Sequence, residues 1–303
     1  MKDRIQAIAI QTLFWTIRLL PVRIAGGLGA AIGRMAFHLM QRHRRITVGN
    51  LARIYPDRGR AWRSQTARES FAELGRSTFE FPHVFLRSRR FLMSRVKVEG
   101  EAPFRQAMDA GNGVVLVASH YCNWELGGLM VSLLGYPSSV IYRPLKQLPL
   151  ESFLLSCRQR FGSLMRSRWN GVRWLKRDLS DGRAIAIMID QHMSQGVPVP
   201  FLGHLANSTT LPAAIARRHQ VPIFGVSIHR VRRSFCFQLR FWPIALPKQA
   251  PDRKLDQYQI TEAIHDSFAS EIHARPESWL WLHRRWFILE HNQILADAVH
   301  GAP

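Results

Sequence analysis

A histidine and a glutamate spaced five residues apart are the pair in this sequence best suited to acid–base chemistry. His120 and Glu125 lie in the segment Ser-His-Tyr-Cys-Asn-Trp-Glu at 119–125, directly after the apolar run at 114–118. An acid that bonds one imidazole nitrogen fixes the tautomer of the ring and stabilises the imidazolium formed when the other nitrogen takes a proton. His120 is therefore predicted to act as a general base, with Glu125 orienting its ring.

Two other interpretations of this segment stay open from the residues alone. With 13 histidines and 21 acidic residues, about one His-x4-acid spacing is expected by chance, so the pair also fits a structural histidine beside a helix-capping glutamate. Cys122, two residues after His120, offers a thiolate nucleophile as a rival route. Against this route, nothing near it in the sequence lowers the pKa of a thiol.

Short apolar runs of strand length recur from residue 111 onward. They lie at 114–118, 139–142, 184–189, 221–228 and 235–241, and helix-length segments separate several of them. This alternation predicts an α/β fold with a central, mostly parallel sheet flanked by helices. His120 and Asp190 each follow one of these runs, so both are expected at the carboxyl edge of the sheet, where ligands bind in such folds.

The first 40 residues form a separate, apolar segment. Residues 5–17 carry no charge, and Arg18 and Pro21 separate them from a second apolar stretch at 24–40. Neither stretch reaches the roughly 18 uninterrupted apolar residues of a spanning helix. Instead, the apolar residues at 13–15 lie near Arg4, Arg18 and Arg23. This combination predicts a membrane-associating helical segment in the headgroup region. A cleaved signal peptide is the alternative.

The rest of the chain is interpreted as one α/β domain over 41–303. Residues 41–100 are rich in arginine and have apolar residues at helical spacing. This pattern predicts a helical collar around the core formed by the later residues. No internal repeat and no low-complexity linker is recognisable in the sequence.

The chain is strongly basic. Its 42 lysines and arginines exceed the 21 acidic residues and give a net charge of +21, which favours a polyanionic partner. Nucleic acid, an anionic membrane surface and an acidic carrier protein all fit this charge. The sequence contains no recognisable nucleic-acid-binding motif, so a nucleic-acid partner is not expected.

The cysteines and histidines argue against a metal site. Three cysteines without a CxxC pair fit neither a disulfide framework nor a structural zinc site, and they favour a reducing compartment. A metal hydrolase using His120, Asp190 and His192 is a weaker alternative, because His120 lacks a partner histidine at i+4. We therefore expect no metal and no cofactor.

The residues around His120 resemble a known family. The segment at 120–125 is similar to the His-x4-Asp/Glu motif of glycerolipid acyltransferases, and the surrounding chain resembles the late acyltransferases of lipid A biosynthesis, the lauroyl and myristoyl transferases. The likeness covers about residues 5–290. The matching segments are Tyr-Arg-Pro at 142–144, Arg-Gln-Arg-Phe-Gly at 158–162, Asp-Gln-His at 190–192, the segment at 197–203 together with the threonine segment at 208–210, and the C-terminal segment at 276–286. Two positions depart from the family pattern: Phe287, where lysine is usual, and Leu211-Pro212, where a glycine is common.

This resemblance implies an α/β acyltransferase domain and a reaction. A fatty acyl chain would pass from acyl carrier protein to a hydroxyl of a lipid A precursor, with His120 as general base and without a covalent intermediate. A different lipid acceptor, such as a phosphoinositide mannoside, an ornithine lipid or a lysophospholipid, is the alternative. The implied location is the cytoplasmic face of the inner membrane, with residues 1–40 holding the protein there.

The resemblance also marks substrate-binding candidates. Arg143, Arg158 and Arg160 are predicted to bind phosphate groups of the donor or acceptor, since guanidinium binds phosphate bidentately; ordinary surface charge is the alternative. Asp190 is predicted to hold one of these arginines or an acceptor hydroxyl, or to cap a turn.

The C-terminal aromatic residues admit two interpretations. Trp279, Trp281 and Trp286 surround a cationic His-Arg-Arg at 283–285. Such a mixture suits a membrane interface, and packing of the tryptophans against the sheet is the equal alternative.

Overall fold

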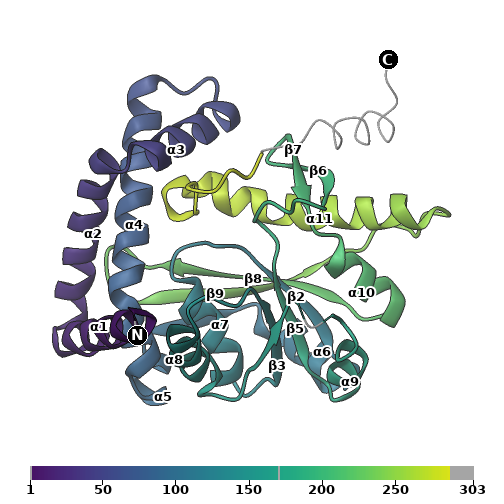
Figure 1. Ribbon diagram of the computed structural model, residues 1–303. Coiled ribbons are helices and arrows are strands. Elements are labelled where there is room, and N and C mark those ends of the chain that lie inside the picture. Colours follow the sequence, from purple (N-terminus) through teal and green to yellow (C-terminus); the bar gives the residue numbers. More distant parts are fainter. Residues whose placement is uncertain (1, 170, 287–303) are drawn as a thin grey trace.

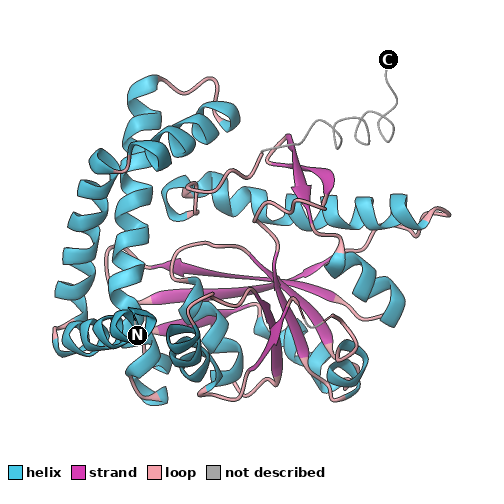
Figure 2. Ribbon diagram, viewed as in Figure 1, coloured by secondary structure: helices cyan, strands magenta, loops and turns pink. Residues whose placement is uncertain are grey.

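A central β-sheet with helices on both faces dominates the structure, a computed structural model that describes residues 2–169 and 171–286 (Figure 1). Phe287 and the side chain of Arg4, which the sequence analysis singled out, lie outside the described part. Helices α6 and α7 cover one face of the sheet, and α10 and α11 cover the other (Figures 1 and 2).

The sheet has seven strands in the order β1-β9-β8-β2-β5-β3-β4, and β6 and β7 form a separate antiparallel hairpin. The strands are β1 Val96–Glu99, β2 Val114–Ala118, β3 Ser138–Tyr142, β4 Leu164–Ser167, β5 Ala184–Met188, β6 Val197–Phe201, β7 His204–Ser208, β8 Ile223–Arg230 and β9 Phe237–Ile244. All five predicted strands are present. Their neighbours pair in parallel except β8 with β9, which are antiparallel, so the prediction of a mostly parallel α/β sheet is confirmed.

Helices make up most of the first hundred residues and then alternate with the strands. They are α1 Lys2–Leu19, α2 Val22–Leu39, α3 Gln41–Ile54, α4 Arg60–Leu86, α5 Arg89–Met93, α6 Glu101–Asp109, α7 Trp124–Leu133, α8 Leu148–Gln159, α9 Leu175–Ser180, α10 Leu211–His219 and α11 Arg253–Ala274. The range 41–100 is thus largely helical, but it also contributes the edge strand β1. In Figure 1, α2 and α4 stand side by side at one end of the sheet, and α1 lies across their base.

Helix α2 packs on α4 through glycines. A methyl group on Gly33 would overlap the backbone of Phe71, and one on Gly29 would overlap the backbone carbonyl of Gly75. Glycine at these positions therefore lets the two helix backbones touch. The contact holds α2 against α4.

Replacing Gly33 by alanine is expected to destabilise the protein by about 1–3 kcal/mol, because the added methyl group has no room at this interface. Gly27→Ala is the matched control in the same helix: nothing lies within 4 Å of its added methyl group, and alanine stabilises a helix interior by up to about 1 kcal/mol relative to glycine. Urea unfolding of both variants measures the difference. Equal stabilities would contradict this account of the α2–α4 contact.

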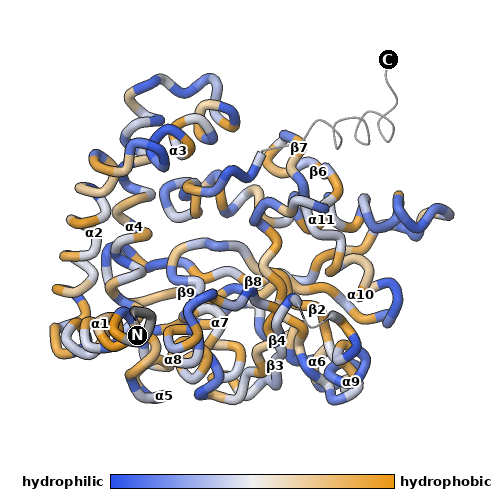
Figure 3. Tube along the Cα trace, in the orientation of Figure 1, coloured by the Kyte–Doolittle hydropathy of each residue, from blue (hydrophilic) through white to orange (hydrophobic). Residues whose placement is uncertain are grey.

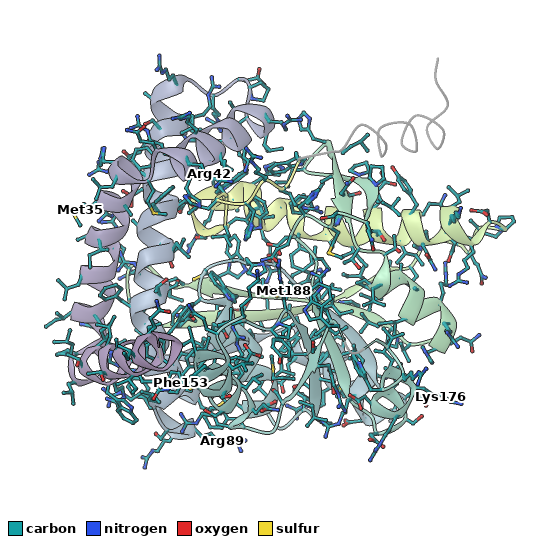
Figure 4. The ribbon with its side chains drawn as sticks, viewed as in Figure 1. Met35, Arg42, Arg89, Phe153, Lys176 and Met188 are labelled. Carbon is teal, nitrogen blue, oxygen red and sulfur yellow. The ribbon has the colours of Figure 1, made fainter. Side chains whose placement is uncertain are left out.

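The outer faces of α1 and α2 carry large apolar side chains. On α1, the exposed apolar residues include Ile8, Leu13 and Trp15, and on α2 they include Met35 and Leu39; Met35 projects away from the domain in Figure 4. Among the residues described, none of the helices combines the length and apolar composition needed to cross a bilayer.

The C-terminal tryptophans belong to the core. Trp279, Trp281 and Trp286 are at most 5% exposed and pack against one another, with ring centroids 4.7–6.1 Å apart. The interpretation of these residues as a membrane interface is therefore wrong, and the packing alternative is confirmed. Buried indole N–H groups still need acceptors, and the carbonyls of Pro276 and Phe201 accept from Trp281 and Trp286.

Candidate active site

His120 lies in the loop that follows β2, beside the end of β5. The two strands pair in parallel in the register Ala118↔Met188, which brings Asp190 next to His120 although the two are far apart in sequence. The predicted meeting of both residues at one sheet edge is therefore confirmed. The His120 imidazole is half-buried, while Asp190 is buried.

Asp190 holds the His120 ring through a set of short hydrogen bonds. One carboxylate oxygen lies 2.7 Å from Nδ1 of His120, and the other accepts from the His120 backbone N–H at 2.6 Å and from the Trp279 indole at 2.9 Å. Burial opposes ionisation, but the attraction of His120 and these hydrogen bonds outweigh it and lower the pKa of Asp190. In the neutral imidazole, an ionised Asp190 favours the proton on Nδ1, and the lone pair is then on Nε2.

The predicted contact from Glu125 to the His120 ring is corrected by the structure. Glu125 lies in the first turn of α7 as expected, but Arg158 from α8 bonds both of its carboxylate oxygens, at 3.0 and 2.5 Å. Glu125 in turn outweighs the effect of burial and raises the pKa of Arg158. Asp190, and not Glu125, thus bonds the imidazole in the structure, while the substrate-binding role predicted for Asp190 stays a prediction.

Nε2 of His120 faces Gln191 and His283. The Gln191 amide nitrogen lies 3.2 Å from Nε2 of His120 and 3.3 Å from Nε2 of His283, so one amide donates to both rings. Burial is the largest cause that lowers the pKa of His283, which favours the neutral form of that ring. Gln191 is exposed. A substrate hydroxyl can therefore replace its amide beside Nε2 of His120.

A cavity of about 370 Å³ opens at this edge of the sheet. His120, Glu125 and Arg158 line it together with Gln191 and with apolar side chains, among them Met188 at the end of β5, which is labelled in Figure 4. The cavity places the His120 imidazole beside a space large enough for part of a substrate. This arrangement suits removal of a proton from a hydroxyl or water held there.

The predicted arginines separate into two groups. Arg143 and Arg158 line the cavity, and so does Arg168, which sequence reasoning missed. Arg160 instead bonds the backbone carbonyls of Phe85 and Arg87 at the end of α4. Its guanidinium thus ties the end of α8 to α4 and does not line the cavity, and its substrate-binding role stays a prediction.

Hydrogen bonds fix the positions of the residues that follow His120. Cys122 has a positive φ of 51°, a strained backbone for a residue with a Cβ, and Asn123 caps α7 by accepting from the Leu126 N–H. The Asn123 amide also donates to Glu80, which pairs with the buried Arg230. This network anchors the catalytic loop to α4.

Cys122 is unsuited to nucleophilic catalysis. Its side chain is buried, its sulfur points at Glu73 rather than into the cavity, and burial raises the pKa of the thiol. A thiolate is the reactive form, so the rival route through Cys122 is contradicted. Among the residues described, no group of three His, Cys, Asp or Glu side chains is arranged to hold a metal ion.

A second, apolar cavity of about 70 Å³ adjoins the first. It lies between α7 and the sheet, and Trp124, Gly128 and Met188 line both cavities. Gly127 and Gly128 of α7 line it; a methyl group added at Gly127 would lie 3.3 Å from the Ile228 side chain of β8, whereas nothing lies within 4 Å of one added at Gly128. An apolar extension of this kind accommodates hydrocarbon.

Comparison with known proteins identifies relatives along nearly the whole chain. The family model described as bacterial lipid A biosynthesis acyltransferase matches residues 4–287. A lipid A biosynthesis acyltransferase of Haemophilus influenzae is 23% identical over 270 residues, covering 86% of this chain and 81% of the relative. The lipid A biosynthesis palmitoleoyltransferase of Escherichia coli is 25% identical over 276 residues, covering 90% and 88%. A phosphatidylinositol mannoside acyltransferase of Mycolicibacterium smegmatis is 26% identical over 185 residues, covering 59% of each chain.

Proposed function

Since the chain belongs to the bacterial lipid A biosynthesis acyltransferase family, we propose that it transfers a fatty acyl chain from acyl carrier protein to a hydroxyl of a lipid A precursor. The observation that carries this proposal is the His120–Asp190 pair, which in the neutral ring favours the tautomer with its lone pair on Nε2, beside the cavity. A thioester is already activated, so the protein needs only to make the hydroxyl nucleophilic and to stabilise the charge that develops.

His120 performs the proton transfers in this mechanism. Its Nε2 takes the proton of the acceptor hydroxyl as the oxygen attacks the thioester carbonyl, and Asp190 stabilises the resulting imidazolium. The attack forms the new C–O bond and moves the carbonyl electron pair onto the carbonyl oxygen. Collapse of this tetrahedral intermediate re-forms the C=O bond and breaks the C–S bond. The imidazolium then protonates the departing thiolate, which returns His120 to its starting state.

The two cavities and the arginines suggest where the substrates lie. The acyl chain occupies the apolar cavity under α7, and its carbonyl reaches the larger cavity at the shared lining of Trp124 and Gly128. Arg143 and Arg168 are both exposed at the larger cavity, which suits them to phosphate groups of the donor or acceptor. Arg158 is already neutralised by Glu125, so we assign this pair to shaping the cavity.

The exposed apolar faces of α1 and α2 support a location at the membrane. Large apolar side chains such as Leu13, Trp15 and Met35 are at least 54% exposed, and burial in the headgroup region removes them from water. Arg18 and Arg23 near the junction of these helices add attraction to anionic lipid, about 1 kcal/mol per cation near the surface. We place this membrane contact on the cytoplasmic face of the inner membrane, where the carrier protein is available.

The acceptor has a second candidate. The similarity to phosphatidylinositol mannoside acyltransferases favours a mannosylated phosphoinositide as the alternative to a lipid A precursor. With either acceptor, His120 would take the proton of a lipid hydroxyl, and Arg143 and Arg168 would be available to phosphate groups.

The donor is tested by a salt series with purified protein. Transfer from acyl carrier protein to the lipid is expected, and its kcat/KM should fall steeply with ionic strength because the net charge of +21 attracts an acidic donor. Acyl-CoA at equal concentration serves as the comparison. A flat salt profile, or a preference for acyl-CoA, would contradict the carrier protein as donor, and absence of any acylated lipid would contradict the proposed function.

A further inference from the structure

Two loops leave the sheet side by side at the mouth of the catalytic cavity. Strands β3 and β4 are parallel neighbours that end opposite each other in the pair Tyr142↔Ser167, and the Arg168 N–H donates to the Tyr142 carbonyl at 3.0 Å. The residues that follow, Arg143 and Arg168, both line the cavity. Anything that contacts these loops therefore lies at the entrance to the active site.

Large apolar side chains project into solvent from both loops. Leu148 is 74% exposed and Trp169 64%, and Leu145 and Val172 are also exposed. None of them lines either cavity described above. A cluster of exposed large apolar groups that fills no pocket indicates an interaction surface.

The same loops carry only positive charge at the surface. Lys146 and Arg173 are exposed beside the apolar side chains, as are Arg143 and Arg168 at the base of the loops. Between residues 143 and 177 the sequence contains one acidic residue, Glu151, and it is buried, with one carboxylate oxygen accepting from the Leu145 N–H. Exposed leucine and tryptophan among cations are the composition of a segment that binds an anionic bilayer.

The first of these two loops, which follows β3, contacts helix α1. The Gln147 amide donates to the Gln6 side chain at 3.0 Å, and Phe153 of α8 packs edge-on against Phe14 of α1. Figure 1 shows α8 beside α1, and Figure 3 shows α1 as largely hydrophobic. The apolar face of α1, which includes the exposed Ile8, thus extends toward the mouth of the cavity.

We propose that Leu145, Leu148, Trp169 and Val172 form a second membrane contact, here named the mouth surface, which inserts into the headgroup region of an anionic phospholipid bilayer. The cavity then opens directly onto the lipid, and a lipid acceptor reaches His120 without leaving the membrane. This inference rests on the proposed function only in taking the acceptor to be a lipid. An acidic carrier protein would also meet the cations, but the exposed tryptophan and the continuity with α1 favour a bilayer.

The mouth surface is tested by vesicle flotation of the full-length protein without substrates. The double variant Leu148→Ser/Trp169→Ser should partition about tenfold more weakly than wild type onto phosphatidylcholine vesicles containing phosphatidylglycerol. The double variant Val231→Ser/Leu255→Ser is the matched control, since both of its residues are 40–45% exposed and lie outside the mouth surface. It should partition like wild type, and thermal melting should be unchanged in both variants because the replaced side chains are exposed.

A second measurement locates Trp169 directly. Brominated phosphatidylcholine in the same vesicles should quench a larger fraction of the fluorescence of wild type than of Trp169→Phe, because bromine quenches only indoles near the bilayer. Equal quenching in the two proteins, or wild-type partitioning of the Leu148→Ser/Trp169→Ser variant, would overturn the proposal. The proposal would also be overturned if the Leu148→Ser/Trp169→Ser variant bound vesicles normally and lost only its activity with acyl carrier protein. That result would assign the mouth surface to binding of acyl carrier protein. Because no reaction is measured in the vesicle assays, their outcome is separate from that of the proposed acyl transfer.

Discussion

Replacing His120 by alanine is expected to lower kcat for acyl transfer by about 10²- to 10⁴-fold, the usual contribution of a general base. The lost group is the unprotonated Nε2 at the wall of the cavity. His283→Ala is the control, because that ring shares the Gln191 amide with His120 but is not held by Asp190; its effect should stay below about tenfold. The measurement is the initial rate at saturating donor and acceptor. A folded His120→Ala protein with wild-type turnover would remove His120 from the mechanism.

Replacing Asp190 by asparagine is expected to reduce kcat by a similar factor, about 10²- to 10⁴-fold, without displacing the ring. An asparagine amide that donates to Nδ1 of His120 leaves the proton on Nε2, so the base is lost although its position is kept. Because the carboxylate also accepts from Trp279, the melting temperature of the variant must be measured beside its rate.

Glu125→Gln separates this mechanism from the one expected from the sequence spacing. It leaves the His120–Asp190 contact in place and weakens only the pair with Arg158, so it should change KM more than kcat. A kcat for Glu125→Gln lower than that for Asp190→Asn would instead support Glu125 as the group that orients the ring.

The sheet and its active edge could be predicted because the information is local. The apolar runs that became β2 and β5 fix which residues follow them, and parallel pairing then brings His120 and Asp190 to one edge. Strands β1 and β4 were missed because each has four residues and no continuous buried face. The reversed direction of β9 is set by its short connection from β8, which the run of apolar residues alone does not reveal.

The partners of the site residues could not be predicted in the same way. Glu125 is near His120 in sequence, but the position of Arg158 depends on how α8 packs beside α7, and that packing decides which acid each group meets. Arg160 follows Arg158 by two residues, at the C-terminal cap of α8, and its side chain points at the end of α4 instead of the cavity. The motif Asp-Gln-His at 190–192 did contain Gln191, and its place beside Asp190 was the available signal for its role.

The C-terminal segment shows a second limit of sequence reasoning. Alternating tryptophans and cations suit a membrane interface, yet Arg285 is buried and bonds the Asn207 carbonyl and the Ser208 hydroxyl of β7. A buried arginine of this kind stabilises the core only where such acceptors are supplied by distant strands. The sequence pattern does not show those acceptors, so only the fold decides between the two interpretations.

The central claim is direct transfer through the His120–Asp190 pair, and mass spectrometry of a quenched reaction tests it most directly. Purified protein would be mixed with the acyl thioester of acyl carrier protein, alone and with the lipid acceptor, and the masses of protein and lipid would be followed together. The account predicts that the lipid gains one acyl chain, that the protein mass stays unchanged throughout, and that His120→Ala leaves the lipid unmodified on the same time scale. An acylated protein that passes its chain to the lipid would contradict it.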